Sequence, residues 1–151
     1  TPKVTPTPKV TPTPKVTPTP KPKVTPTPKP GALSVTPSDG FVSTRPSVAG
    51  GKSIPGSKIY TVKNTGGSTI DWEVSFDRNS IWVFQSIFNG RLGAGATDEV
   101  TVTIDDIAID LFILPGLTTP ELNDILRFSN ITNRNGDTTR SVSLKFTPQD
   151  L

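Results

Sequence analysis

Residues 60–76, YTVKNTGGSTIDWEVSF, contain two alternating runs joined by a turn, and the predicted fold depends on this pattern. Its first part alternates apolar and polar residues, and NTGGS at residues 64–68 then supplies a turn. The last part places Trp72, Val74 and Phe76 on one face of an extended chain, with acidic and hydroxyl side chains on the other. Strict alternation predicts a strand with one buried face, and a glycine-rich cluster between two such runs predicts the turn that joins them.

The same pattern recurs on both sides of this stretch. Apolar patterning predicts further strands at residues 32–36, 59–63 and 99–104, around Leu126 and Phe128, and finally around Val142, Leu144 and Phe146. Residues 81–84 are continuously apolar and aromatic, which predicts a segment near the edge of the core. Asn-Gly within residues 133–137 predicts a hairpin loop between the last two strands. Residues 43–57, rich in Gly, Ser and Pro, are expected to form a loop. About seven short strands predict an immunoglobulin-like antiparallel β-sandwich over residues 31–151.

Residues 1–30 form a separate, extended tail of the dipeptides Thr-Pro, Lys-Val and Lys-Pro. Every odd position is Thr or Lys and every even position is Pro or Val. Successive residues of an extended chain direct their N–H and C=O groups to opposite edges, and proline has no N–H. The Thr/Lys edge therefore keeps all its donors, whereas the other edge keeps donors only at Val4, Val10, Val16 and Val24.

Two interpretations of the tail follow. It could add as a strand to a sheet along its Thr/Lys edge, as in donor-strand assemblies. It could instead be a stiff spacer, because Pro-rich chains span about 3.1 Å per residue, or roughly 90 Å in all.

The charge is divided unequally between the two parts. The tail carries six lysines and no acid, while the rest carries ten basic and thirteen acidic residues. A basic arm can indicate nucleic-acid binding, but this one lacks the arginines and aromatics that bind phosphates and bases. A cationic tail beside an acidic domain favours association between copies of the chain, and no nucleic-acid partner is expected.

Composition argues against catalysis. The chain has no cysteine and no histidine, which removes the usual nucleophile–base pairs and the usual zinc ligands, so we expect neither an enzyme nor a cofactor. Asp105, Asp106 and Asp110 could bind calcium, although acidic residues at a strand end are usually only solvated. Trp72 and Trp82 could form a sugar platform if exposed, but tryptophan in a sandwich is more often core. No apolar run approaches the length of a membrane span.

One apolar stretch, residues 104–117, stands apart from the alternating pattern. The simpler interpretation is a buried strand or a segment that crosses the core. The functional interpretation is an apolar acceptor patch for a partner, since large exposed apolar patches are uncommon on monomers. Its members would be Ile107, Ile109, Leu111, Phe112 and Ile113.

Several of these motifs together resemble the bacterial immunoglobulin-like repeats of the BACON type. The resemblance rests on LSVTP at residues 33–37, YTVKNTGGSTIDW at 60–72, LGAGA at 92–96 and the Asn-Gly hairpin. It implies a β-sandwich of secreted or surface proteins, found beside enzymes or linkers. The tail in turn resembles the Pro/Thr linkers of extracellular bacterial proteins, which implies O-glycosylation, for example at Thr5, Thr7, Thr11 and Thr13.

These observations predict a non-catalytic, secreted or cell-surface structural protein, such as a filament subunit, whose partners are other copies of itself and glycans attached to the tail. The alternative is a spacer or carbohydrate-binding module of a larger secreted enzyme or scaffold protein. In the first case the residues that would make the assembly contact are those of the tail's repeats: Val4, Val10, Val16, Val24, Lys3, Lys9 and Lys15.

Overall fold

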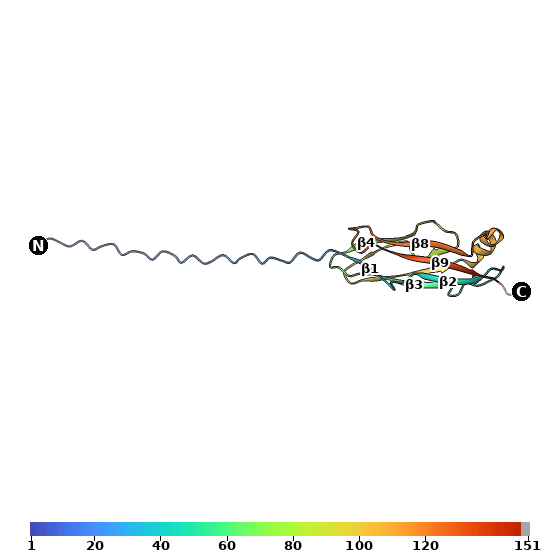
Figure 1. Cartoon of the computed structure of the whole chain (residues 1–151). Helices are drawn as coiled ribbons and strands as arrows, with labels where there is room; N and C mark the ends of the chain where they lie inside the picture. The colour runs from blue at the N-terminus through green and yellow to red at the C-terminus, as the bar shows by residue number, and fades with distance from the viewer. Residues whose placement is uncertain (149–151) are drawn as a thin grey trace.

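The structure, a computed structural model, describes residues 1–148, so residues 149–151 of the expected domain lie outside the described part. A long tail leads into a sandwich of strands (Figure 1). The strands are β1 (Leu33–Thr36), β2 (Phe41–Pro46), β3 (Ser57–Asn64), β4 (Ile70–Phe76), β5 (Val83–Gln85), β6 (Asn89–Leu92), β7 (Thr97–Ile104), β8 (Glu121–Asn130) and β9 (Thr138–Thr147). Three short helical turns, α1 (Asp106–Ala108), η1 (Ile109–Ile113) and η2 (Leu114–Gly116), lie between β7 and β8.

The strands form two sheets, ordered β1-β3-β7-β5 and β2-β9-β8-β4-β6. The immunoglobulin-like β-sandwich is thereby confirmed, with nine strands in place of about seven. The expected hairpin joins β8 to β9, and Gly136 adopts the positive φ of 87° that its turn requires. One pair departs from the antiparallel expectation, because β2 runs parallel to β9.

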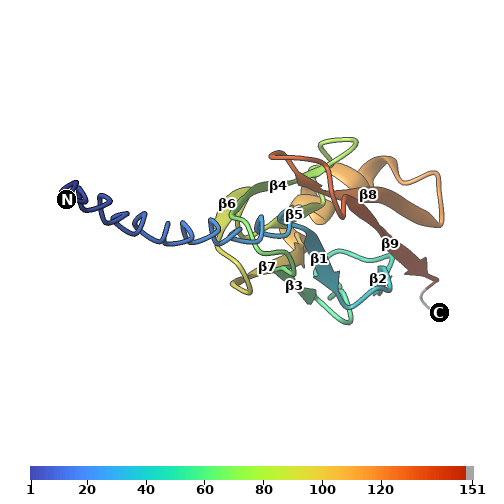
Figure 2. The ribbon, with the colours of Figure 1, turned by 90° about the vertical axis from the view of Figure 1, so that its left-hand side faces the viewer.

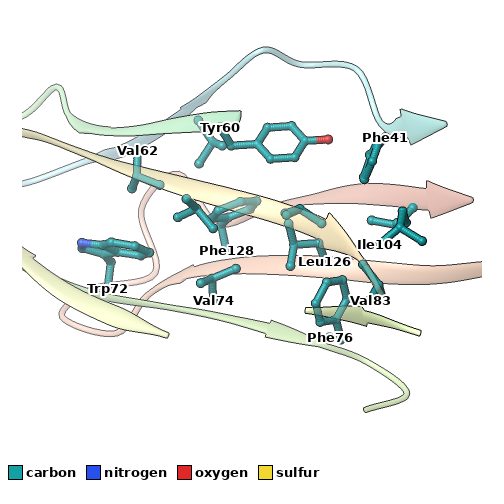
Figure 3. Close-up of a cluster of buried hydrophobic side chains, with 14 of the residues drawn as sticks. Phe41, Tyr60, Val62, Trp72, Val74, Phe76, Val83, Ile104, Leu126 and Phe128 are labelled. Carbon is teal, nitrogen blue, oxygen red and sulfur yellow. The ribbon is translucent and has the colours of Figure 1, made fainter. Parts of the chain in front are cut away.

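The core lies between the two sheets, where their inward side chains meet (Figure 3). Trp72, Val74 and Phe76 of β4 are buried together, as the alternation predicts. Tyr60 of β3 packs edge-on against Phe128 of β8 at 5.8 Å between ring centroids. Contacts of this kind join the two sheets over a continuous apolar layer.

β2 occupies part of the segment that the sequence indicated as a loop. Its inward residues after Phe41 are Ser43 and Arg45, both fully buried, so the strand lacks an apolar alternating face. The Ser43 hydroxyl donates to the carbonyl of Pro55 at 2.8 Å, and Arg45 pairs with acids far along the chain. Polar partners outside the strand therefore stabilise it, which explains why periodicity does not reveal it.

The apolar stretch after β7 is helical, so the prediction of a buried strand is wrong. Asp105 accepts a hydrogen bond from the Ala108 amide at 3.0 Å through its side chain and begins the first turn. The turns direct Ile109 into the core and leave Ile107, Leu111 and Phe112 exposed. Within residues 1–148, no helix is both long and apolar enough to cross a membrane.

Candidate functional site

The tail extends away from the sandwich along its long axis and makes no strand pair with its own domain in the described chain (Figure 1). Viewed nearer its own axis, it winds as an open helix, as expected for polyproline II (Figure 2). Its valines are 86–91% exposed, so their apolar side chains are unpartnered in a single copy. The threonines proposed for O-glycosylation are exposed as well.

The last residues of the tail are held by the turn between β3 and β4. The Lys29 carbonyl accepts hydrogen bonds from the Gly67 amide at 3.0 Å and from the Ser68 hydroxyl at 3.2 Å. Asn64, fully buried, accepts through Oδ1 from the Ala32 amide at 3.2 Å and donates from Nδ2 to the Ser68 carbonyl at 2.8 Å. The NTGG turn thus serves as a clamp on the tail.

The β8–β9 hairpin holds the same short segment from the other side. Nδ2 of Asn133 donates to the Gly31 carbonyl at 2.9 Å, and the Leu33 amide donates to the Asn135 carbonyl at 2.9 Å. We call this clamped region, residues 29–33 with the turns at 64–68 and 133–137, the joint. Because two turns hold it, the joint fixes the direction in which the tail leaves the domain.

Glycines make this close approach possible. A Cβ on Gly66 would lie 2.0 Å from the Pro30 carbonyl oxygen, and one on Gly136 would lie 2.0 Å from the Leu33 carbonyl oxygen. A Cβ on Gly31 would lie 2.3 Å from Ile70 Cγ2. Real Cβ atoms do not approach other heavy atoms so closely, so only glycine fits at these three positions without displacement of the backbone.

The helical turns lie at the opposite end of the sandwich from the joint, near the C-terminus (Figure 1). Of the five residues proposed as an acceptor patch, Ile107, Leu111 and Phe112 are 62–69% exposed, Ile113 is half-buried and Ile109 belongs to the core. We refer to these three exposed side chains, all on the helical turns, as the apolar end patch. Because it lies on helical turns, it offers no strand edge to a partner.

The helical turns are held by a cluster of charged residues. The buried guanidinium of Arg45 forms an ion pair with Asp110. Its Nε atom also lies 3.7 Å from Oδ1 of Asp106. Asp106 also accepts from the Ser53 hydroxyl at 2.6 Å. Desolvation alone would raise the pKa of Asp110, but the bonds from Arg45 and the Gly50 amide outweigh it and hold that pKa below its ordinary value of 3.8. These acids thus serve as structural partners of Arg45 and Ser53.

The other candidate groups also have structural partners. Trp72 and Trp82 are buried, so neither forms an exposed sugar platform. The indole N–H of Trp72 donates to Asp98 at 3.3 Å. Burial raises the pKa of Tyr60 to about 12, which keeps its hydroxyl protonated. Among residues 1–148, no group of three or more His, Cys, Asp or Glu side chains is placed to hold a metal ion.

Comparisons with known proteins concern the fold. No family model and no curated protein sequence matches the chain. The solved structure of the E. coli chaperone DraB is 12% identical at a TM-score of 0.47, over 78% of this chain and 55% of the chaperone. The PapD-like domain of human CEP192 is 13% identical at a TM-score of 0.44, over 93% of this chain and 99% of that domain. A Bacteroides ovatus GH5 xyloglucanase is 14% identical at 0.46, over 77% of this chain and 19% of the enzyme.

The chain spans little more than half of the chaperones' length, 55% for DraB and 58% for the periplasmic chaperone SfaE. The chaperones and the CEP192 domain belong to the PapD-like and immunoglobulin-like β-sandwiches. At these identities the likeness extends to the sandwich architecture alone.

Proposed function

We propose that the chain is a non-catalytic structural subunit of an extracellular or cell-surface assembly, in which the tail of one copy connects to a neighbouring copy. The observation that carries the proposal is the joint. A swivelling linker needs no clamp, whereas here two turns and three tightly placed glycines hold residues 29–33 against the domain.

The direction of the tail supports the same function. The joint lies at one end of the sandwich and the apolar end patch at the other (Figure 1). A stiff connector that leaves one end can meet a second copy without returning to its own domain. Repetition of such a head-to-tail contact does not close on itself and builds fibres.

Charge adds a weaker contribution. The tail carries six positive charges, and the remainder of the chain carries three more acidic than basic residues. Opposite charges on the two parts attract copies to one another over roughly a Debye length, about 10 Å at 0.1 M salt.

The second candidate is a spacer or carbohydrate-binding module of a larger secreted enzyme or scaffold protein. The near-complete exposure of the tail valines favours it, because a solvated spacer needs no apolar partner. In that case the tail would hold the sandwich at a distance from whatever precedes it, without a contact to another copy.

Replacement of residues 1–28 by a Gly-Ser sequence of equal length separates the two candidates. It removes the alternating pattern and keeps the joint. By light scattering, the intact chain should show a mass that rises with concentration, while the replaced chain should remain near the mass of one copy. A constant single-copy mass for both proteins would favour the spacer and overturn the proposal, as would equal association of both.

A further inference from the structure

We propose that the tail of a second copy adds as an antiparallel strand to the outer edge of β6, with the valine of one Lys-Val repeat directed into the rim of the sandwich beside Phe88. This inference rests on the proposed function and names the acceptor. It follows from which backbone groups the tail can offer and which edge of the sandwich can take them.

The tail restricts the acceptor through its backbone. Only its Thr and Lys positions form an unbroken row of N–H and C=O groups, so these positions must face the acceptor strand. In an antiparallel pair, residues that exchange both hydrogen bonds are directly opposite and direct their side chains to the same face. For Pro and Val to point inward, the free backbone groups of the acceptor must therefore belong to residues whose side chains point outward.

The outer edges of the four-stranded sheet do not meet this condition. On β5, the ladder bonds from Ser86 to Thr101 and from Asp105 to Trp82 leave the backbone groups of Val83 and Gln85 directed to the open edge. The side chains of these two residues are buried in the sandwich. On β1, the residues whose backbone groups face away from β3, Leu33 and Val35, likewise have buried side chains. The Leu33 amide also already donates to the hairpin. Addition at either edge would bury Thr and Lys and expose Val.

β2 has the correct orientation, but its edge is already used. Thr44 exchanges backbone hydrogen bonds with Ile54 at 3.0 and 2.8 Å. Pro46, the next outward residue of the same strand, has no N–H to offer. Only Val42 is left with both backbone groups free for a partner on that edge.

β6 meets the condition and is open. Val74 donates to the Phe88 carbonyl at 2.7 Å, so the alternation directs the backbone of Phe88 and Gly90 to β4 and that of Asn89 and Arg91 outward. Asn89 and Arg91 also carry exposed side chains. In the part of the chain that the structure describes, no turn or loop bonds to the backbone of either residue.

The rim beside β6 is apolar and incompletely covered. Phe88 lies on the inward face of the ladder, yet it is 66% exposed, because no strand lies beyond β6. Phe88 lines a pocket of about 300 Å³ whose other apolar lining residues are Phe76, Val83 and Phe84, and whose polar lining residues are Ser75, Asn79, Ser80 and Gln85. An added valine opposite Phe88 would occupy this rim and remove apolar surface of both copies from water.

The first three Lys-Val repeats then give three equivalent registers on β6. With Lys9 opposite Asn89, Val10 lies opposite Phe88 and Thr7 opposite Arg91. Lys9 then lies on the same face as Glu73, which pairs with Asn89 on the other side of β6. Placement of the repeats at Lys3 and Lys15 gives the same matches.

The fourth repeat does not fit this register. With Lys23 opposite Asn89, the inserted Lys21 lies opposite Arg91, and like charges directly opposite are unfavourable. The first three repeats therefore supply strands, and the residues that follow span the distance between copies.

Disulfide trapping tests the register, because the natural chain contains no cysteine. Val10→Cys and Phe88→Cys chains are mixed and oxidised, beside mixtures of Val10→Cys with Ile107→Cys and of Val24→Cys with Phe88→Cys. Crosslinking of 10 to 88 should exceed both controls about tenfold. Equal or greater yield with Ile107→Cys would place the acceptor on the end patch, and equal yield from Val24→Cys would reject the register; either result overturns the inference.

Proline substitutions test the edge without a crosslink. Arg91→Pro removes an outward N–H of β6, and Val42→Pro removes the matching N–H of β2, while neither removes a ladder bond within the domain. Arg91→Pro should raise the concentration for half-assembly about tenfold, whereas Val42→Pro and Arg91→Ala should leave it unchanged. Thermal melting reports whether each variant folds. If Arg91→Pro chains assemble normally, β6 is not the acceptor; if wild-type chains never associate, the proposed function fails with it.

Discussion

Glycine at three positions decides how the tail meets the domain. Gly66 admits the Pro30 carbonyl, Gly136 admits the Leu33 carbonyl, and Gly31 packs against Ile70. At each position the absence of a side chain allows a close contact with the backbone or side chain of a neighbouring segment. These residues hold a stiff segment at a set angle and contribute little apolar surface.

Gly66→Ala tests this role. The added Cβ overlaps the Pro30 carbonyl, so the tail must shift and the bond from Gly67 to Lys29 should weaken. We expect a loss of about 1–3 kcal/mol in the free energy of unfolding and faster hydrogen exchange at the Gly67 amide. Urea denaturation and exchange followed by NMR measure the two effects.

Gly93→Ala is the matched control, because its Cβ would have no heavy atom within 4 Å. It should leave both quantities unchanged. Equal effects of the two substitutions would show that loss of a glycine, and not crowding of the joint, is responsible.

At the scale of elements, the strands with an alternating apolar face were predictable from the sequence. β4, β7 and β9 occur where the sequence predicts them, because their inward residues are nearly all apolar. β2 was not predictable, since Arg45 faces inward and pairs with Asp110, 65 residues further along. The helical turns were not predictable either. Residues 104–117 carry apolar side chains at both alternating sets of positions, a pattern that fits a buried strand as well as helical turns of which only Ile109 is buried.

The joint also lay beyond prediction. The NTGG turn indicated a connection between strands, but nothing in its residues indicates that it binds the end of the tail. Asn133 contacts Gly31 across 102 positions of sequence. Contacts of this separation are set by the packed sheets and have no local pattern.

The cluster that holds the helical turns predicts an acid-sensitive contribution to stability. The pKa of Asp110 is held below 3.8 in the folded chain, so its pairing with Arg45 stabilises the fold above that pH and is lost as pH falls through the folded value. We expect the fall in Tm between pH 6 and about pH 2 to be smaller for Asp110→Asn than for the natural chain. Calorimetric melts across this range measure it, and an unchanged pH dependence would contradict the assignment.

At the scale of the whole molecule, the opposite charges of tail and domain predict a dependence on salt. Screening shortens the range of attraction from about 10 Å at 0.1 M to about 3 Å at 1 M ionic strength. We therefore expect the concentration for half-assembly to rise severalfold between these two conditions, as measured by light scattering. Assembly that strengthens steadily with salt would indicate that apolar burial alone drives it.

The molecule as a whole pairs a rigid sandwich with a stiff arm, and each carries what the other lacks. The tail has an unbroken row of backbone donors along one edge, and β6 has an open edge beside an exposed Phe88. In a single copy the Thr/Lys edge of the tail and the open edge of β6 are both unpaired. In a row of copies, every such edge would be paired except those at the two ends of the row. Repeated head-to-tail pairing would therefore satisfy the edges of every copy inside such a row.

Head-to-tail pairing can be tested by negative-stain electron microscopy of the intact chain beside a chain whose residues 1–28 are replaced by Gly-Ser. We expect regular filaments from the intact chain and isolated particles from the replaced one. Isolated particles from the intact chain at every concentration would contradict head-to-tail pairing and leave the tail as a spacer.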